Sequence, residues 1–210
     1  MIVDCIVLGA YQTNGYVVRT EESSKTCLVI DAGLDGHDLV TFLHERQLTP
    51  DGVVLTHGHV DHIAGLLHLQ AVLSDVHVYI HQMDGPMLTD PVKNLSAMAG
   101  QAVTLDCNTV LVSEGDTIEA ADMSLQVIHT PGHTPGGMCL YAPSHDILFA
   151  GDTLFQQSVG RTDFPGGSMP ELKAAIKQKL FVLPDATVVY PGHGPKTSIG
   201  DEKQSNPFVR

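Results

Sequence analysis

Thr56-His57-Gly58-His59-Val60-Asp61-His62 places three histidines and one aspartate within six positions of the chain. Residues 51–55 before it predict a short buried strand, and residues 63–67 after it begin an apolar run with a helical period. The cluster is therefore expected on a turn between a strand and a helix. Imidazole and carboxylate groups are ligands of zinc and related metals. A solvated surface loop is the alternative, and the dense, ordered spacing favours a metal site.

The order of residues inside this turn suggests how it is used. His57 and His59 flank one glycine, so both can face the same side, and Gly58 permits an unusual backbone angle. Asp61 and His62 are adjacent, so their side chains point in different directions. We therefore expect this second pair to be able to serve a second ion.

Composition restricts the classes of protein to consider. A chain of 210 residues with 43% hydrophobic and 17% charged residues predicts one α/β domain that buries a real core. The net charge is −13, and no run of Lys or Arg offsets it. Because phosphate binding needs basic patches, a nucleic-acid partner is not expected. Bound divalent cations would still allow an anionic substrate.

The cysteines and the N-terminus predict a cytoplasmic protein. The four cysteines have no C-x-x-C spacing, and Cys5, Cys27 and Cys139 lie in apolar, strand-like runs, where we expect small buried thiols. Residues 1–7 carry an acid where a signal peptide has a basic region. No apolar run approaches the length that spans a membrane, so no membrane association is expected.

Alternation and turn residues predict a strand-rich chain. Asn14-Gly15 is read as a turn after the first strand. Short helices and a mobile loop are expected over residues 82–100, whose methionines either cover a pocket or pack in the core. The expected strands are residues 2–8, 16–19, 25–30, 52–55, 76–80, 109–112, 117–120, 123–129, 137–142, 146–150 and 187–190.

Helices are expected between these strands, with one predicted by a capping signature. Ser168-Met169-Pro170-Glu171 places a cap and an acid three residues apart, which predicts a helix over about 169–181. The other expected helices are residues 35–47, 62–73 and a short turn at the start of the tail 201–210. Strand-rich blocks and helices in two halves predict two sheets packed face to face with helices outside.

Three later segments repeat the design of the opening turn. Each places a ligand-type residue in a Gly/Pro turn directly after an expected strand, where site residues usually lie. They are Thr130–Gly136 with His133, Phe149–Thr153 with Asp152, and Tyr190–Pro195 with His193.

In this order the residues resemble the pattern H-x-H-x-D-H…H…D…H of the metallo-β-lactamase superfamily. The resemblance covers nearly the whole chain, and within the superfamily it is similar to the glyoxalase II-like hydrolases. The blocks that carry this likeness are residues 130–136, 151–155, 160–164, 191–194 and 206–208. The resemblance implies the four-layer αββα sandwich of that superfamily.

The resemblance also implies two divalent metal ions, zinc first, with iron or manganese as alternatives. His57, His59 and His133 would hold one ion, and Asp61, His62 and His193 the other, with Asp152 bridging them. It makes Asp61 and Asp152 the candidate catalytic carboxylates. The implied reaction is hydrolysis of a small thioester, such as S-lactoylglutathione or a related thiol-carrier ester, by deprotonated water on the ions.

Two further residues are assigned candidate roles. The resemblance suggests that Asp31 orients a metal-binding histidine, and the alternative is a turn-capping aspartate. Arg161 is a candidate for binding a substrate carboxylate, and the alternative is a structural ion pair with Asp163.

The sequence departs from glyoxalase II in ways that keep other functions open. The C-terminal helical extension that binds glutathione is not expected in residues 1–210, and Asp163 stands where the family has an aromatic residue. The G-R-T-D-F block at 160–164 also resembles the persulfide dioxygenases, which would use iron on His57, His133 and Asp152. A scaffold that binds metal only for stability and a β-lactamase are weaker alternatives.

Overall fold

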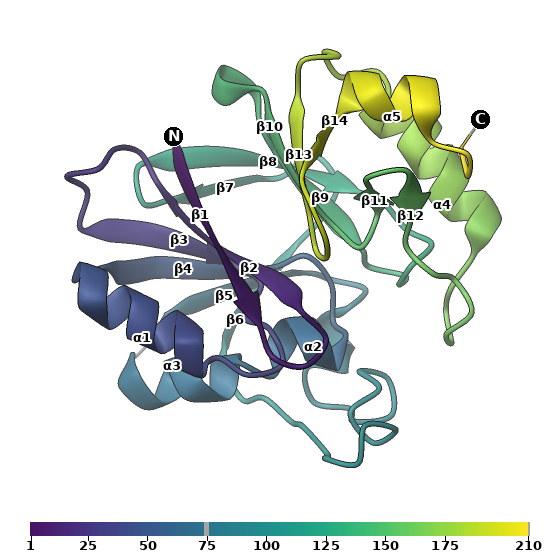
Figure 1. Ribbon diagram of the computed structural model, residues 1–210. Helices are drawn as coiled ribbons and strands as arrows, with labels where there is room; N and C mark the ends of the chain where they lie inside the picture. The colour runs from purple at the N-terminus through teal and green to yellow at the C-terminus, as the bar shows by residue number, and fades with distance from the viewer. Residues whose placement is uncertain (74–75, 210) are drawn as a thin grey trace.

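The computed structural model describes residues 1–73 and 76–209, and two sheets that face each other dominate it (Figure 1). The first sheet follows the order of the chain, with antiparallel strands β1 to β3 and parallel pairing from β3 to β6. Its strands are β1 (Ile2–Leu8), β2 (Thr13–Arg19), β3 (Thr26–Ile30), β4 (Thr49–Leu55), β5 (His77–His81) and β6 (Asn108–Val112).

The second sheet has the order β14-β13-β10-β9-β8-β7 and is antiparallel except for the pair β10 and β13. A two-stranded hairpin, β11 and β12, follows β10. These strands are β7 (Thr117–Ala120), β8 (Met123–His129), β9 (Met138–Ala142), β10 (Ile147–Gly151), β11 (Leu154–Phe155), β12 (Ser158–Val159), β13 (Val188–Pro191) and β14 (Thr197–Ser198).

Helices cover the outer faces of both sheets, which confirms the four-layer αββα sandwich (Figure 1). None of the helices in the described ranges is long and apolar enough to cross a membrane. The helices are α1 (His37–Arg46), α2 (Val60–Ile63), α3 (Leu66–Val72), α4 (Met169–Ala175) and α5 (Ile199–Ser205), with short turns η1 (Gly85–Met87), η2 (Pro143–His145) and the π-helical η3 (Ile176–Leu180).

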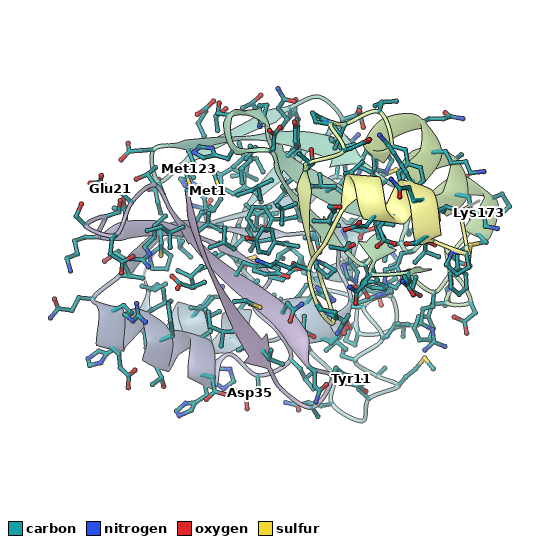
Figure 2. All side chains as sticks on the ribbon, turned by 45° about the horizontal axis from the view of Figure 1, so that its top comes forward. Met1, Tyr11, Glu21, Asp35, Met123 and Lys173 are labelled. Carbon is teal, nitrogen blue, oxygen red and sulfur yellow. The ribbon has the colours of Figure 1, made fainter. Side chains whose placement is uncertain are left out.

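Both faces of the central strands are buried, and this explains their continuous apolar runs. In β3, Cys27 and Val29 pack against α1 and α3, whereas Leu28 and Ile30 pack toward the second sheet. Phe149 of the second sheet is fully buried in that shared layer. Side chains fill the space between the ribbons throughout (Figure 2).

Two predicted element boundaries were wrong, each for a packing reason. Asn14-Gly15 is not a turn but part of β2, because the buried Asn14 amide donates to the carbonyls of Pro191 and Gly194 at 3.0 and 2.9 Å. The predicted helix 62–73 is divided into α2 and α3. A Cβ at Gly65 would lie 1.9 Å from the Ala32 carbonyl oxygen, so the chain passes very close to the end of β3 there.

Smaller differences concern the edges of the sheets and the tail. Cys5 is exposed rather than buried, because β1 is an edge strand, whereas Cys27 and Cys139 are buried as predicted. The hairpin β11–β12 and strand β14 were not predicted. The tail forms a helix as expected, beginning at Ile199, and Arg210 lies outside the described residues.

Candidate metal centre

The structure brings all seven predicted ligand residues to one place. Strands β4, β8, β10 and β13 end at the same edge of the sandwich, and each is followed by one of the predicted turns. Ligand atoms within 4.8 Å of one another form three groups: His57, His59 and His133; His57, His62 and Asp152; Asp61, His62 and His193. Segments far apart in the chain therefore make one continuous cluster.

Asp31, at the end of β3, fixes the ring of His62. Its carboxylate accepts from His62 Nδ1 at 2.8 Å and from the backbone N–H and hydroxyl of Thr56, both at 2.8 Å. Because the Thr56 hydroxyl donates to Asp31, its oxygen is free to accept from His57 Nδ1 at 3.2 Å. The Nε2 atoms of His57 and His62 are therefore directed into the cluster, and Asp31 contacts one of the predicted ligand histidines.

Main-chain carbonyls orient two of the remaining histidines in the same way. His133 Nδ1 donates to the Arg161 carbonyl at 2.7 Å, and His193 Nδ1 donates to the Tyr11 carbonyl at 3.1 Å. A carbonyl can only accept, so the Nε2 atom of each ring carries the lone pair in the neutral histidine. His59 differs, since its Nδ1 is the atom that meets His133 Nε2, at 3.0 Å.

The donor atoms of this cluster fit a divalent metal. His57 Nε2, His62 Nε2 and Asp152 Oδ1 are buried without a hydrogen-bond partner in the protein. Orphaned buried polar atoms are costly, and a cation would satisfy all three. Tetrahedral zinc with Zn–N distances near 2.0–2.1 Å separates its nitrogen ligands by roughly 3.3 Å, close to the 3.0 Å between His59 and His133.

The electrostatics of the cluster also favour bound positive charge. Burial lowers the pKa of His57 well below its usual range, and burial with the neighbouring His133 lowers the pKa of His59 to about 3. Burial opposes a charge on His62, but nearby carboxylates, Asp31 and Asp152 foremost, raise its pKa well above the usual value. The neutral donors His57 and His59 thus lie close to carboxylates that attract a cation.

Gly58 is needed for close approach rather than for an unusual backbone angle. Its φ is not positive, but a Cβ there would lie 2.6 Å from the Cβ of Met87. Met87 is 6% exposed and belongs to η1, within the segment 82–100. One predicted methionine therefore packs in the core directly behind the ligand turn, whereas Met98 lines the cavity described below.

Sequence reasoning missed Asp84, which connects two ligand-bearing loops. This fully buried carboxylate accepts from Gly58 N at 3.0 Å, from Thr134 Oγ1 at 2.7 Å and from Gly136 N at 2.6 Å. Burial raises the pKa of Asp84 against the opposing effect of these donors. No spacing in the sequence linked residue 84 to the histidines, and its only signal was an acid four residues after the end of the predicted strand 76–80.

A cavity of about 630 Å³ opens above the cluster. Arg161 lines it, but its Nε and Nη2 donate to the two carboxylate oxygens of Asp163, both at 2.7 Å. Its guanidinium also lies 4.1 Å from the centre of the Phe164 ring. The structure thus contains the ion pair that the sequence left as the alternative to substrate binding.

Known proteins are similar to this chain over nearly its full length. The chain is 36% identical to the "Probable metallo-hydrolase YqgX" of Bacillus subtilis, with 96% of this chain and 94% of that protein covered. It is 31% identical to "Hydroxyacylglutathione hydrolase GloC" of Haemophilus influenzae, with coverage of 100% and 98%.

Solved structures agree with the fold and the family model. The BLEG-1 B3 metallo-beta-lactamase superposes with a TM-score of 0.92 at 39% identity, covering 99% of both chains. TTHA1623, solved in a di-iron-bound form, gives a TM-score of 0.87 at 36% identity, covering 98% of this chain and 100% of that one. The family model "Metallo-beta-lactamase superfamily" matches residues 8–193. The chain therefore belongs to the metallo-beta-lactamase superfamily.

Proposed function

We propose that this protein is a two-metal hydrolase that cleaves a small thioester, in the manner of glyoxalase II. S-Lactoylglutathione or a related thiol-carrier ester is the substrate class. Water is added across the carbonyl–sulfur bond: a C–O bond forms and the C–S bond breaks. One proton of the water ends on the released thiol, and the other leaves to solvent as the product acid ionises.

The convergence of two ligand groups at the floor of one cavity carries this proposal. His57, His59 and His133 would hold one ion, and Asp61, His62 and His193 a second, with Asp152 shared. Two divalent ions, zinc in our proposal, supply Lewis acidity for the carbonyl and for the attacking water. The related TTHA1623 carries two irons, so iron is the second choice.

The chain itself contributes orientation and proton acceptance. Asp31 and the Arg161 carbonyl accept hydrogen bonds from the Nδ1 atoms of His62 and His133, and these bonds orient the two rings. Asp61 and Asp152 are the acids that line the cavity among the described residues. Their carboxylates are therefore placed to accept the proton that the attacking water loses.

The relatives are consistent with hydrolysis. GloC is named for hydrolysis of a hydroxyacylglutathione, and YqgX is named a probable metallo-hydrolase. The absence of basic runs from the sequence is consistent with a small-molecule substrate rather than a nucleic acid. We place the activity in the cytoplasm, because all four cysteines are free thiols.

Metal analysis paired with a thioester assay tests this function. Freshly purified protein is expected to carry two divalent ions per chain and to release thiol from S-lactoylglutathione or another thioester. Removing the metal with a chelator should abolish release, and adding zinc should restore it. Two ions without hydrolysis of any thioester, with turnover of a β-lactam instead, would contradict the proposal.

A second candidate is a mononuclear iron persulfide dioxygenase. His57, His133 and Asp152 form a two-histidine, one-carboxylate set, and the iron in TTHA1623 shows that a related chain accepts that metal. This function would require neither Asp61 nor His193 as a ligand. One iron per chain and oxygen uptake with glutathione persulfide would establish it in place of the hydrolase.

A further inference from the structure

Apolar side chains line one side of the cavity above the metal cluster, and we call this side the wall. Leu95 and Met98 come from the segment that follows η1, and Phe155 and Val159 come from the hairpin β11–β12. Met98 is 75% exposed, so a large apolar side chain is left facing solvent at the rim. Tyr11, from the β1–β2 turn, also lines the cavity and is 54% exposed (Figure 2).

The Leu95 part of this wall is rigidly held in a strained conformation. Leu95 has φ +68°, a left-handed angle that a branched side chain rarely adopts. The fully buried Asn94 enforces it: its amide donates to the Met87 and Val103 carbonyls at 2.9 and 3.0 Å. Its side-chain oxygen accepts from Ser96 N at 3.0 Å. Strain that its surroundings fix in this way is typical of binding sites.

The hairpin side of the wall is fixed from behind by α5. Glu202, which is 1% exposed, accepts from Gln157 N at 2.8 Å in the β11–β12 turn. Asn206 donates to the Ser158 carbonyl at 3.0 Å and to Glu202 at 2.8 Å. Both sides of the wall are therefore preformed, which reduces the entropy lost when a ligand is bound.

The cavity offers little to a charged thiol carrier. Among the described residues that line it, Arg161 is the single Lys or Arg, and its guanidinium already pairs with Asp163. The acids in the lining, Asp61 and Asp152, belong to the metal cluster. A carrier with free carboxylates, such as glutathione, would have to displace Asp163 to pair with a cationic side chain of this lining.

We propose that this cavity selects its substrate by an apolar, uncharged acyl chain packed on the wall of Leu95, Met98, Phe155 and Val159, and not by the charge of the thiol carrier. The inference rests on the proposed thioesterase function. The acyl chain is the part of a thioester that can be wholly apolar. The polar carrier is then left toward the opening of the cavity.

Four thioesters separate acyl selection from carrier selection: acetyl and hexanoyl groups, each on N-acetylcysteamine and on glutathione. Each buried CH₂ contributes about 0.8 kcal/mol, or about fourfold in binding. We expect kcat/KM for hexanoyl to exceed that for acetyl by at least about tenfold on either carrier, which needs two buried CH₂ groups. Glutathione should change kcat/KM by less than about threefold relative to the neutral carrier.

Variants of the wall test which residues make the contact. Leu95→Ala and Met98→Ala should each lower kcat/KM for hexanoyl esters about fivefold to tenfold and that for acetyl esters less than twofold. Met83→Ala is the matched control, because Met83 is also exposed and lies in the same segment but does not line the cavity. Met98→Ala keeps the test valid if Leu95→Ala fails to fold.

A binding measurement separates this inference from the proposed function. Calorimetry with non-hydrolysable S-hexyl and S-methyl thioethers of N-acetylcysteamine should show at least tenfold tighter binding of the hexyl compound, with the difference reduced by Leu95→Ala. Absence of hydrolysis of all four thioesters by metal-loaded protein would overturn the thioesterase, while the thioethers still report the wall. Equal binding of hexyl and methyl, or a tenfold preference for glutathione esters, would overturn the inference.

Discussion

The two halves of the metal cluster differ in charge and in exposure. The first group lies deep, with no residue more than 4% exposed, whereas in the second group the side chains of Asp61 and His193 are 20% and 28% exposed. The first group is His57, His59 and His133, and the second is Asp61, His62 and His193.

The pKa shifts of the two ligand groups also differ. Burial keeps His57 and His59 neutral, whereas Asp61 overcomes the effect of burial on His193 and raises its pKa. For Asp61, its histidine neighbours overcome burial and lower its pKa. His57 and His59 are thus neutral donors, whereas Asp61 and His193 form a charged pair at the cavity. From this difference we expect the first group to hold its ion more firmly than the second.

Removing one ligand from each group should break this comparison most severely. His57→Ala is expected to lose the anchored ion and to lower kcat/KM by roughly a thousandfold or more, since Lewis-acid stabilisation is worth several kcal/mol. Asp61→Ala should retain one ion per chain yet lose a similar factor in hydrolysis. Metal content and thioester kinetics measure both effects. An Asp61→Ala protein with undiminished turnover would remove the second group from catalysis.

Asp84→Ala should weaken the first group more than the second. It leaves two backbone N–H groups and the Thr134 hydroxyl without their acceptor, at a cost of about 2–4 kcal/mol in the free energy of unfolding. The loops of His59 and His133 then lose their common tie, and we expect about tenfold to hundredfold weaker metal binding there.

Urea unfolding and metal titration, followed separately for each ion, check the prediction for Asp84. Asp84→Asn should lie between the unmodified protein and Asp84→Ala in stability and in metal affinity. Its amide oxygen still accepts a hydrogen bond, but its NH₂ group faces a donor. If Asp84 had a purely structural role, Asp84→Ala would lower the urea midpoint. The dissociation constants of both metal ions would then be unchanged under conditions in which the protein is folded.

Acid and alkali should destabilise the metal-free protein through different groups. A histidine with a lowered pKa stabilises the fold fully above the unfolded value of about 6.5, and for His59 this contribution is lost as pH falls toward about 3. His62 has a raised pKa, so its contribution is complete below about 6.5 and is lost as pH rises through its folded value. Stability should therefore be greatest near pH 6.5.

Urea midpoints of chelator-treated protein between pH 4 and 9 measure this profile. His62→Gln should reduce the alkaline decline, with the raised pKa of His193 accounting for the part that remains, and His145→Gln, at an exposed position outside the cluster, should leave it unchanged. A urea midpoint that keeps rising through pH 8 would show that the carboxylates around His62 do not keep its imidazole protonated at that pH.

The sequence predicted the ligand turns because each combines a local strand pattern with a ligand residue. His133, Asp152 and His193 all follow predicted strands, and the parallel pairing of β10 with β13 brings two of these turns together. Local patterns fail where tertiary contacts decide. Asn14-Gly15 is normally a hairpin signal, but here the Asn14 amide satisfies buried carbonyls of the His193 loop. Asp84 acquires its role only when residues 58, 134 and 136 surround it.

The smallest expected effect concerns Arg161, where the side chain and the main chain act differently. Its carbonyl orients His133, whereas its exposed side chain pairs with Asp163 at the rim of the cavity. Arg161→Gln keeps the carbonyl, so metal binding by the first group should be unchanged. Because exposed ion pairs contribute little, the melting temperature should move by no more than about 1–2 °C.

Kinetics on two carriers decide what the Arg161 side chain does. We expect KM to change less than about threefold for S-lactoylglutathione and for the matching N-acetylcysteamine ester alike. Asp163→Asn is the complementary variant, because it removes the carboxylate that pairs with Arg161 and keeps the positive charge of the guanidinium. If Arg161→Gln raises KM tenfold for the glutathione ester alone, the guanidinium exchanges Asp163 for a substrate carboxylate. The positive charge of Arg161 at the rim of the cavity would then contribute to substrate recognition together with the second group.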